Sequence, residues 1–200
     1  IHTLDDGLNN AEIEMSVISD GIVKPFYTLY SPDGKEICSG IVCKKTSFEV
    51  NNAVLWTPET PALYTLKIKC GDENIYFKLG MRKFEIKNSV VLLNGVKFKC
   101  RGINRHDSDP ETGYAVSVES MKRDLRLLKQ ASVNMIRTSH YPNDPRFTAL
   151  CDKYGLYVCD ETDLETHGAR PWYALSRSPE WEGEYVDRVQ RMVERDKNHP

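Results

Sequence analysis

The chain has 200 residues, the length of one large domain or two small ones. Hydrophobic residues make up 40% and aromatic residues 10% of the chain, enough to build a core, which excludes a globally disordered protein. The 27 Lys and Arg residues are balanced by 29 Asp and Glu residues, for a formal net charge of −2 at pH 7, and no apolar run approaches the ~20 residues of a membrane span. We therefore expect neither nucleic acid nor a membrane as a partner.

The six cysteines contain no Cys-x-x-Cys pair. Their pattern favours small buried side chains in a reducing compartment over a disulfide framework, and we expect a cytoplasmic protein. The chain opens on Ile1 rather than Met and stops at Pro200 without a tail. We expect the natural N-terminus to be missing, so the absence of a signal peptide says little.

The first 80 or so residues predict an all-β module. Residues 11–18 alternate polar and apolar side chains, as a strand with one buried face does. Further strand-like segments lie at 26–30, 47–50, 63–69 and 74–79, with turns such as 31–35 and 70–74 between them. This spacing of roughly 8–12 residues predicts a β-sandwich, and no helical periodicity occurs before Phe84.

After Phe84 the pattern predicts strands that alternate with helices. A β pair at 83–86 and 90–93 is followed by the turn Asn94-Gly95 and a strand over 96–102. A helix follows, with Ser117 as N-cap and one apolar face. That face comprises Val118, Met121, Leu125 and Leu128.

Two more strands and two more helices complete the pattern. Residues 133–137 form a short strand, Asp144 and Pro145 begin a helix that Gly155 ends, and residues 156–159 form the next strand. A third helix begins at Ser178, and we expect one apolar face of it to point inward. That face comprises Trp181, Tyr185, Val189, Met192 and Val193.

Alternating βα units predict a parallel sheet. A flavodoxin-like open sheet is one possibility, although no Gly-rich phosphate loop follows any of the strands. The other is the beginning of a (β/α)₈ barrel, which needs ~250 residues when closed.

All three parallel strands end in polar segments, at 104–107, 137–143 and 160–168. Because the carboxyl ends of parallel strands meet at one edge of the sheet, these segments form the candidate site. His106, His140 and His167 occupy equivalent places, one after each strand. A lone histidine is more often a core or loop residue, but this threefold coincidence favours function.

Glu165 and His167 lie two residues apart, so their side chains share a face of an extended segment and suit a divalent cation. Two ligands cannot close a site, and spacing alone slightly favours a solvated loop over a metal site. Arg137 is either a carboxylate clamp or a member of a structural ion pair. The adjacent carboxylates Asp160 and Glu161 point to opposite faces, so at most one faces the centre of a barrel.

Two of the three tryptophans have different interpretations. Trp181 lies in the apolar stripe of the third helix and is expected in the core. Trp172 lies in a polar loop, where it either stacks on a sugar or packs over the mouth of a barrel.

Several of these motifs resemble the glycoside hydrolases of family two. Residues 101–106, 136–145 and 160–168 resemble successive barrel motifs of that family, with the β-galactosidases as the best match. Residues 51–64 and 79–83 resemble the immunoglobulin-like domain before the barrel and its junction, and 191–200 the helix that leads to the fourth strand. The resemblance covers nearly the whole chain in one order.

The resemblance implies an immunoglobulin-like β-sandwich over 1–82, followed over 83–200 by the first three βα units of a (β/α)₈ TIM barrel. It implies retaining hydrolysis of terminal β-galactosides by a homo-oligomeric parent protein. His106 and His140 match histidines that contact the galactosyl group, Arg137 an arginine beside the catalytic carboxylates, and Asn104 a residue of the pocket wall. Glu165 and His167 match two ligands of an active-site Mg²⁺.

Retaining glycosidases need two carboxyl groups ~5–5.5 Å apart. In this family both are glutamates on later strands, so we expect no catalytic carboxylate before Pro200 and no activity of this chain alone. Two alternatives remain: a non-catalytic carbohydrate-binding or structural module, and a family-two hydrolase of another glycoside, such as a glucuronide or mannoside.

Overall fold

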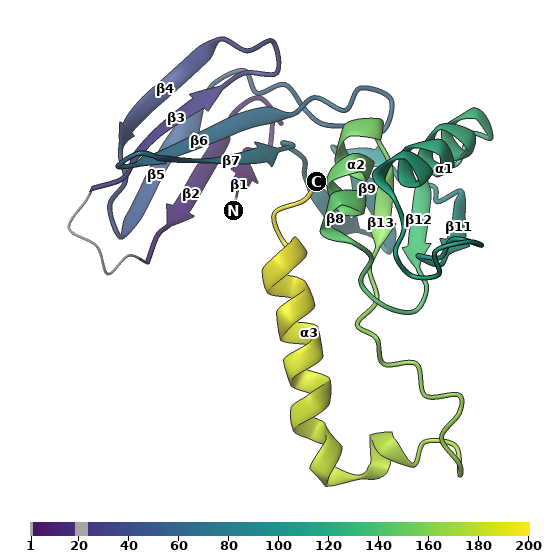
Figure 1. Ribbon diagram of the computed structural model, residues 1–200. Helices are drawn as coiled ribbons and strands as arrows, with labels where there is room; N and C mark the ends of the chain where they lie inside the picture. Colours follow the sequence, from purple (N-terminus) through teal and green to yellow (C-terminus); the bar gives the residue numbers. More distant parts are fainter. Residues whose placement is uncertain (1, 19–23) are drawn as a thin grey trace. The chain divides into compact units, whose positions relative to one another are not determined.

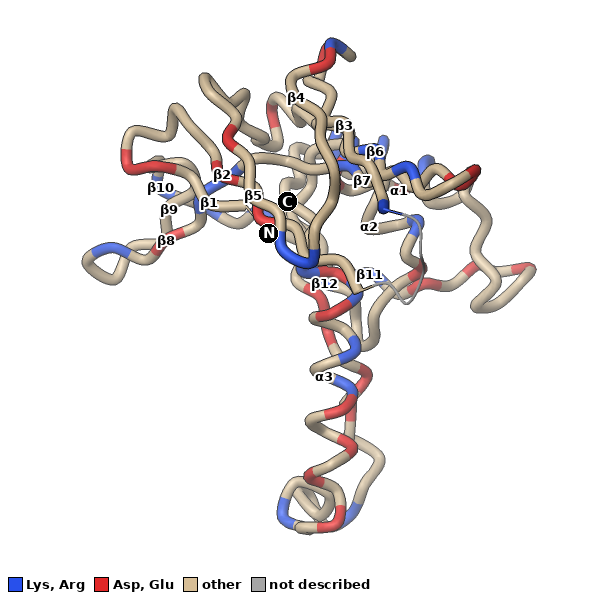
Figure 2. Tube along the Cα trace, turned by 90° about the vertical axis from the view of Figure 1, so that its left-hand side faces the viewer, with Lys and Arg blue, Asp and Glu red and all other residues tan. Residues whose placement is uncertain are grey.

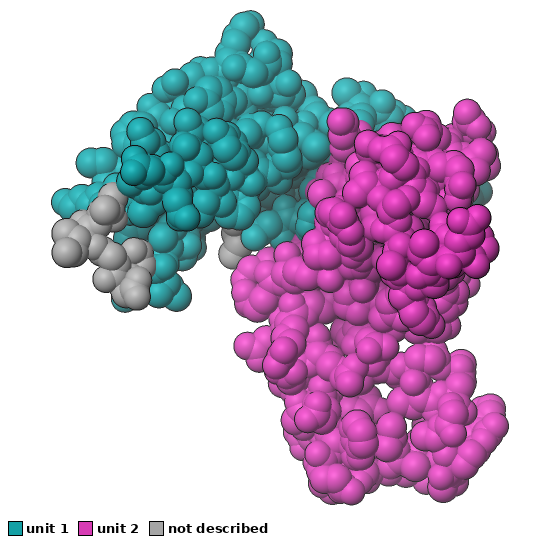
Figure 3. Space-filling model, viewed as in Figure 1, with its two compact units in different colours: residues 1–99, 198–200 teal, residues 100–197 magenta. Residues whose placement is uncertain are grey.

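The computed structural model describes residues 2–18 and 24–200. Two compact units divide the chain, residues 1–99 with 198–200 and residues 100–197 (Figure 3). Residues 83–99, assigned to the barrel from the sequence, fall in the first unit by this division.

The first unit contains two antiparallel sheets whose inner faces share one apolar core (Figure 1). One sheet has the order β1-β2-β5 and the other β4-β3-β6-β7. The strands are β1 (His2–Leu4), β2 (Ala11–Ser16), β3 (Phe26–Tyr30), β4 (Glu36–Ile41), β5 (Lys45–Val50), β6 (Tyr64–Cys70) and β7 (Glu73–Leu79). Alternate residues are buried, as Ala11, Ile13 and Met15 are in β2, so the predicted β-sandwich is confirmed.

The sequence pattern missed β1 and β4. The strand β1 has only three residues. The strand β4 lies at the edge of its sheet and has no buried residue. A half-exposed edge strand needs no alternation of polar and apolar side chains, and the pattern that reveals a strand is therefore absent.

Three further strands form a small antiparallel sheet with the order β10-β9-β8. They are β8 (Phe84–Lys87), β9 (Val90–Leu93) and β10 (Val96–Lys97). The expected strand over 96–102 is wrong as one element, because β10 ends at Lys97 and the next strand begins at Gly102. The chain leaves its antiparallel partner β9 and joins a parallel partner, and one straight strand cannot pair with both.

The second unit contains a parallel sheet of order β11-β12-β13, covered by α1 and α2. The elements are β11 (Gly102–Arg105), α1 (Val118–Gln130), β12 (Met135–Thr138), α2 (Pro145–Tyr154) and β13 (Tyr157–Cys159). The predicted helix signals are confirmed: Ser117 accepts a hydrogen bond from the Ser120 N–H, Asp144 from the Arg146 N–H, and Gly155 ends α2 with φ +73°. Hydrogen bonds from the Arg146 side chain lower the pKa of Asp144 to about 2.

The third helix differs from its expectation. Two 3₁₀ turns, η1 (Leu175–Arg177) and η2 (Pro179–Trp181), precede α3 (Glu182–Asp196), which therefore begins after the expected Ser178. No residue of α3 is buried, and Trp181, expected in the core, is 38% exposed. Val189 and Val193 are 43% and 45% exposed, because no described element covers the apolar stripe of α3. Both signs of charge alternate along the helix (Figure 2).

None of the helices in the described part of the chain is long and apolar enough to cross a membrane.

Asn94 fastens the small sheet to the sandwich core within the first unit. Its side-chain Oδ1 accepts a hydrogen bond from the Lys83 N–H at 2.8 Å, and its Nδ2 donates to the Trp56 carbonyl at 3.1 Å. Trp56 is fully buried, and Asn94 has φ +48°, a left-handed conformation that Asn tolerates.

We predict that Asn94→Ala lowers the free energy of unfolding by about 2–3 kcal/mol, because two backbone groups lose their partner. Asn88→Ala is the matched control: Asn88 also has a positive φ, at +50°, but it is exposed in a turn, and we expect a loss of about 1 kcal/mol. Urea unfolding of both variants measures the difference. Equal losses would contradict the role given to the two hydrogen bonds.

Asp160, directly after β13, contacts the end of α3. Its Oδ1 accepts a hydrogen bond from the Thr138 hydroxyl at 2.7 Å, and its Oδ2 lies 3.7 Å from Arg195 Nη2. Burial, together with a hydrogen bond to the Asp196 carboxyl, raises the pKa of Asp160 to about 6. The folded protein therefore holds this proton more tightly than the unfolded chain does.

We predict that Asp160 makes the protein less stable as pH rises from about 4 through about 6, because the raised pKa favours the folded state only while the carboxyl is protonated. Asp160→Asn keeps the acceptor for Thr138 and removes the charge. We expect its Tm to exceed that of the wild type at about pH 7.5 and to match it at about pH 4. Asp187→Asn, which removes an exposed carboxylate paired with Arg191, is the control and should show no such gain.

Candidate functional site

Two sets of polar side chains point from opposite faces of the parallel sheet. The register pairs Asn104 with Arg137 and Arg105 with Thr138 on neighbouring strands. Because successive strand residues point to opposite faces, Asn104 and Arg137 share one face and Arg105 and Thr138 the other. The Asp160 side chain contacts Thr138 on the face of Arg105. The Glu161 side chain contacts Arg137 on the face of Asn104, which we call the first face. The expectation that these adjacent carboxylates do not act as a pair agrees with this geometry.

Glu161 lies at the centre of the first face. Its Oε1 accepts a hydrogen bond from Arg137 Nε at 2.5 Å, and its Oε2 lies 3.2 Å from His140 Nδ1. Arg137 Nη1 lies 3.4 Å from Asn104 Oδ1. Burial alone would raise the pKa of Glu161, but the hydrogen bonds from Arg137 and His140 outweigh it and lower the pKa, so the carboxylate is ionised.

The three predicted histidines lie in one continuous cluster with Glu165. The rings of His106 and His140 are 5.4 Å apart, edge to face. His140 Nδ1 lies 3.4 Å from Glu165 Oε2, and the other oxygen of Glu165 contacts His167 Nδ1. The structure therefore brings together all six site residues expected from the sequence, which come from the ends of three strands. They are Asn104, His106, Arg137, His140, Glu165 and His167.

The cluster is partly open. The side chains of His140 and Glu165 are 31% and 34% exposed, and that of His167 is 85% exposed. Donors and acceptors at hydrogen-bond distance from one another, with one side open to solvent, suit a polyhydroxylated ligand. Such a ligand needs fixed partners for several hydroxyl groups.

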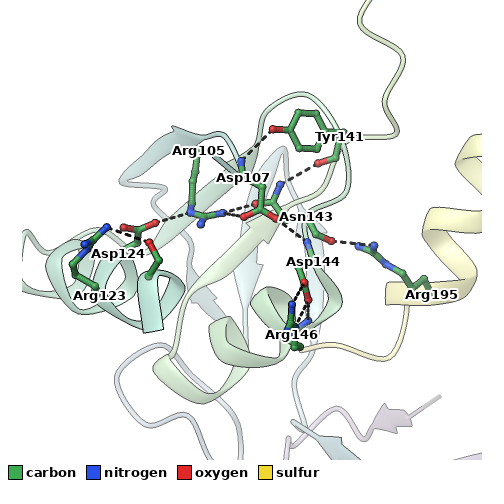
Figure 4. A network of polar contacts seen from close by, with 10 residues as sticks. Arg105, Asp107, Arg123, Asp124, Tyr141, Asn143, Asp144, Arg146 and Arg195 are labelled. Atoms are coloured by element: carbon green, nitrogen blue, oxygen red, sulfur yellow. Dashed lines mark hydrogen bonds and ion pairs between the residues drawn. The ribbon is translucent and has the colours of Figure 1, made fainter. Parts of the chain in front are cut away.

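A second network of polar contacts is built around Arg105 (Figure 4). Arg105, 7% exposed, donates to Asp107 Oδ1 at 2.7 Å, Asn143 Oδ1 at 2.9 Å and Asp124 Oδ2 at 3.1 Å. Asp107 Oδ2 accepts a hydrogen bond from the Asp144 N–H at 3.0 Å. This network joins the end of β11, the helix α1 and the loop before α2. It fixes the two loops that carry His106 and His140.

Sequence reasoning missed the roles of Arg105, Asp107 and Glu161. The alternation of side chains was the available signal: Arg105 and Asp107 flank His106, so they must point away from it. Nothing in the sequence alone showed which residues they meet.

Glu165 and His167 fit a divalent cation in part. A carboxylate oxygen is a ligand that Mg²⁺ prefers, and the two side chains converge. Among the described residues no group of three or more His, Cys, Asp or Glu side chains is arranged to hold a metal ion. Within the described residues, Glu165 and His167 therefore supply two ligands, and no third His, Cys, Asp or Glu side chain joins them.

Trp172 lies outside the cluster. It is 60% exposed, and the Arg170 guanidinium lies 5.1 Å from the centre of its ring system. Stacking on a sugar and packing over the mouth of a barrel both stay predictions.

Comparison with known proteins identifies the family of the chain. Residues 4–82 match the model for glycosyl hydrolases family 2, and residues 84–200 match the model for the TIM barrel domain of that family. The chain is 48% identical to the β-galactosidase of Vibrio vulnificus over 151 residues, which are 72% of this chain and 15% of that protein. It is 43% identical to the β-galactosidase of Staphylococcus xylosus over 166 residues, 82% of this chain and 17% of that protein.

Solved structures agree on the fold. A β-glucuronidase of Ruminococcus gnavus superposes with a TM-score of 0.88 at 26% identity, over all of this chain and 34% of that one. A β-D-glucuronidase of Dictyoglomus thermophilum superposes with a TM-score of 0.85 at 25% identity, over all of this chain and 36% of that one.

The chain spans about one sixth of the length of these curated β-galactosidases. Two models of the family together cover nearly the whole chain, and relatives named β-galactosidase are 48% and 43% identical to it over the aligned residues. The chain therefore belongs to glycosyl hydrolase family 2 and comprises sandwich and TIM-barrel sequence of that family.

Proposed function

We propose that the protein containing this chain hydrolyses terminal non-reducing β-D-galactosides with retention of configuration. One observation carries the proposal: Arg137, His140 and Glu165 lie together at the carboxyl ends of the parallel strands. They do so in a chain that is 48% identical to a β-galactosidase. In TIM barrels this end of the sheet is where active sites lie. A cytoplasmic location and a homo-oligomeric parent remain part of the proposal, the former supported by six cysteines that are all free thiols.

Each residue of the cluster has a task in this proposal. His106 and His140 hold hydroxyl groups of the sugar, and Asn104 forms part of the pocket wall. Arg137 supplies a fixed positive charge beside the reacting groups. Glu165 and His167 would hold Mg²⁺, which when bound supplies positive charge at the edge of the pocket. The two carboxyl groups of the retaining reaction, placed after Pro200 by the resemblance, remain an expectation.

A second candidate is hydrolysis of another β-glycoside. The solved structures that superpose on the whole chain are named β-glucuronidases, so the fold by itself suits a glucuronide as well. The Glu165-Thr166-His167-Gly168 segment and the β-galactosidase relatives favour the galactoside. A non-catalytic carbohydrate-binding module is the remaining alternative.

The test is a panel of nitrophenyl glycosides given to the full-length protein, with β-galactoside, β-glucuronide and β-mannoside as substrates. We expect turnover of the β-galactoside to exceed that of the others. A preference for the glucuronide or mannoside would reject the galactosidase proposal and keep the hydrolase. Binding of galactose without turnover of any member would favour the carbohydrate-binding module.

We predict that the 200-residue chain alone hydrolyses no chromogenic β-galactoside, since neither catalytic carboxyl group is assigned within it. The purified chain and the full-length protein are assayed side by side at equal molar concentration. Measurable turnover by the chain alone would show that the reacting groups lie among its own residues.

We predict that His167→Ala in the full-length protein weakens activity chiefly through metal dependence. Loss of one ligand should raise the Mg²⁺ concentration for half-maximal activity by about tenfold or more. Asp163→Asn is the control, because Asp163 lies in the same loop and pairs with Arg188 outside the cluster. An unchanged response to Mg²⁺ would remove His167 from the site.

A further inference from the structure

Glu161 contacts two site residues at once and has no role assigned from the sequence. One oxygen accepts a hydrogen bond from Arg137 at 2.5 Å, and the other lies 3.2 Å from His140. The backbone N–H of Glu161 donates to Thr138 Oγ1 at 3.1 Å, so the residue is itself attached to β12. No other carboxylate in the described residues contacts both Arg137 and His140.

The contact with Glu161 fixes the plane of the Arg137 guanidinium. The group is planar with donors in fixed directions, so a carboxylate bound at Nε sets where Nη1 and Nη2 point. These two nitrogens lie 3.4 Å from Asn104 Oδ1 and 3.3 Å from His140 Nδ1. Without Glu161 the side chain would keep its charge and lose its orientation.

Glu161 also acts, together with Glu165, on which ring nitrogen of His140 carries the proton. Two carboxylate oxygens, from Glu161 at 3.2 Å and Glu165 at 3.4 Å, face Nδ1. Arg137 Nη2 at 3.3 Å can only donate and would need a bare Nδ1. All three contacts involve a charged partner, and two carboxylates facing Nδ1 outnumber one guanidinium, so the geometry favours the proton on Nδ1. In the neutral ring, Nε2 is then an acceptor.

We propose that Glu161 is a positioning residue for glycoside hydrolysis: it orients Arg137 and makes His140 present Nε2 as an acceptor to a sugar hydroxyl. The inference rests on the proposed function in that it assigns Arg137 and His140 to the sugar pocket. It does not depend on which sugar is the substrate.

The first test is kinetic and uses the full-length protein. We expect Glu161→Gln, which keeps the shape but replaces one acceptor by a donor, to lower kcat by about 100-fold, the effect of a misplaced reacting group. KM should change less than about threefold, because the sugar still meets the same side chains. Glu161→Asp keeps the charge and should recover at least about tenfold of the loss.

Asp163→Asn is the matched control. Asp163 lies two residues further along the same loop, pairs with Arg188 and has φ +58°, a conformation that Asn adopts readily. We expect its kcat to stay within about twofold of the wild type. A Glu161→Gln variant that also stays within twofold would overturn the proposal.

A comparison in the background of a double mutant separates positioning from a general structural role. If Glu161 acts through Arg137 and His140, Glu161→Gln should cost little, less than about threefold in kcat, once Arg137→Ala and His140→Ala are already present. A loss as large as in the wild-type background would show that Glu161 acts in another way.

Crystal structures of the wild type and the variants give a readout that does not depend on turnover. In Glu161→Gln the Arg137 and His140 side chains should leave their wild-type positions, and in Asp163→Asn they should keep them. If both stay in place in Glu161→Gln, the proposal is wrong whatever the activity. If the wild type cleaves a glycoside other than the galactoside, the proposed function fails and the kinetic comparison uses that glycoside.

Discussion

Arg105 and Asp107 form an ion pair beneath the candidate site, and the loops that carry His106 and His140 are both attached to it. The guanidinium donates to Asp107 and Asn143 and lies 4.0 Å from the centre of the Phe147 ring. Two charges so far from water are stable only while each has its partners, and removing one partner of a buried pair typically costs about 3–5 kcal/mol. The pair therefore holds the end of β11 and the loop before α2 in one arrangement.

Strand alternation separates the groups that support the site from those that form it. Arg105 and Asp160 lie on one face of the parallel sheet with the helices, and Asn104, Arg137 and Glu161 lie on the other. The same rule gives adjacent carboxylates different surroundings: burial raises the pKa of Asp160 to about 6, whereas hydrogen bonds from Arg137 and His140 lower the pKa of Glu161. A one-residue shift of register would exchange the two sets and destroy the site.

The two units are stabilised in different ways. The sandwich has an apolar core with buried side chains such as Leu29, Val50 and Met81. Every buried polar or charged residue found in the described part of the chain lies in the second unit. Polar side chains that are held in fixed positions need buried hydrogen-bond partners, and the second unit supplies them.

Local signals in the sequence determined much of the protein. Alternation predicted five of the seven sandwich strands, Ser117, Asp144 and Gly155 marked ends of α1 and α2, and three polar segments after three strands marked the candidate site. These features succeed because each depends on residues close in the chain. The edge strand β4 and the break between β10 and β11 were missed because they depend on which neighbours a strand finds.

Only the tertiary structure decided which polar residues act together. The sequence left Arg137 as either a carboxylate clamp or half of an ion pair, and the fold shows it bound to Glu161, 24 residues away. It left Trp181 in an apolar stripe, and the fold shows that stripe uncovered in the described residues. The physical reason is the same in both cases: a side-chain pattern fixes the face on which a residue lies, but its partners come from distant segments, and only folding brings these together.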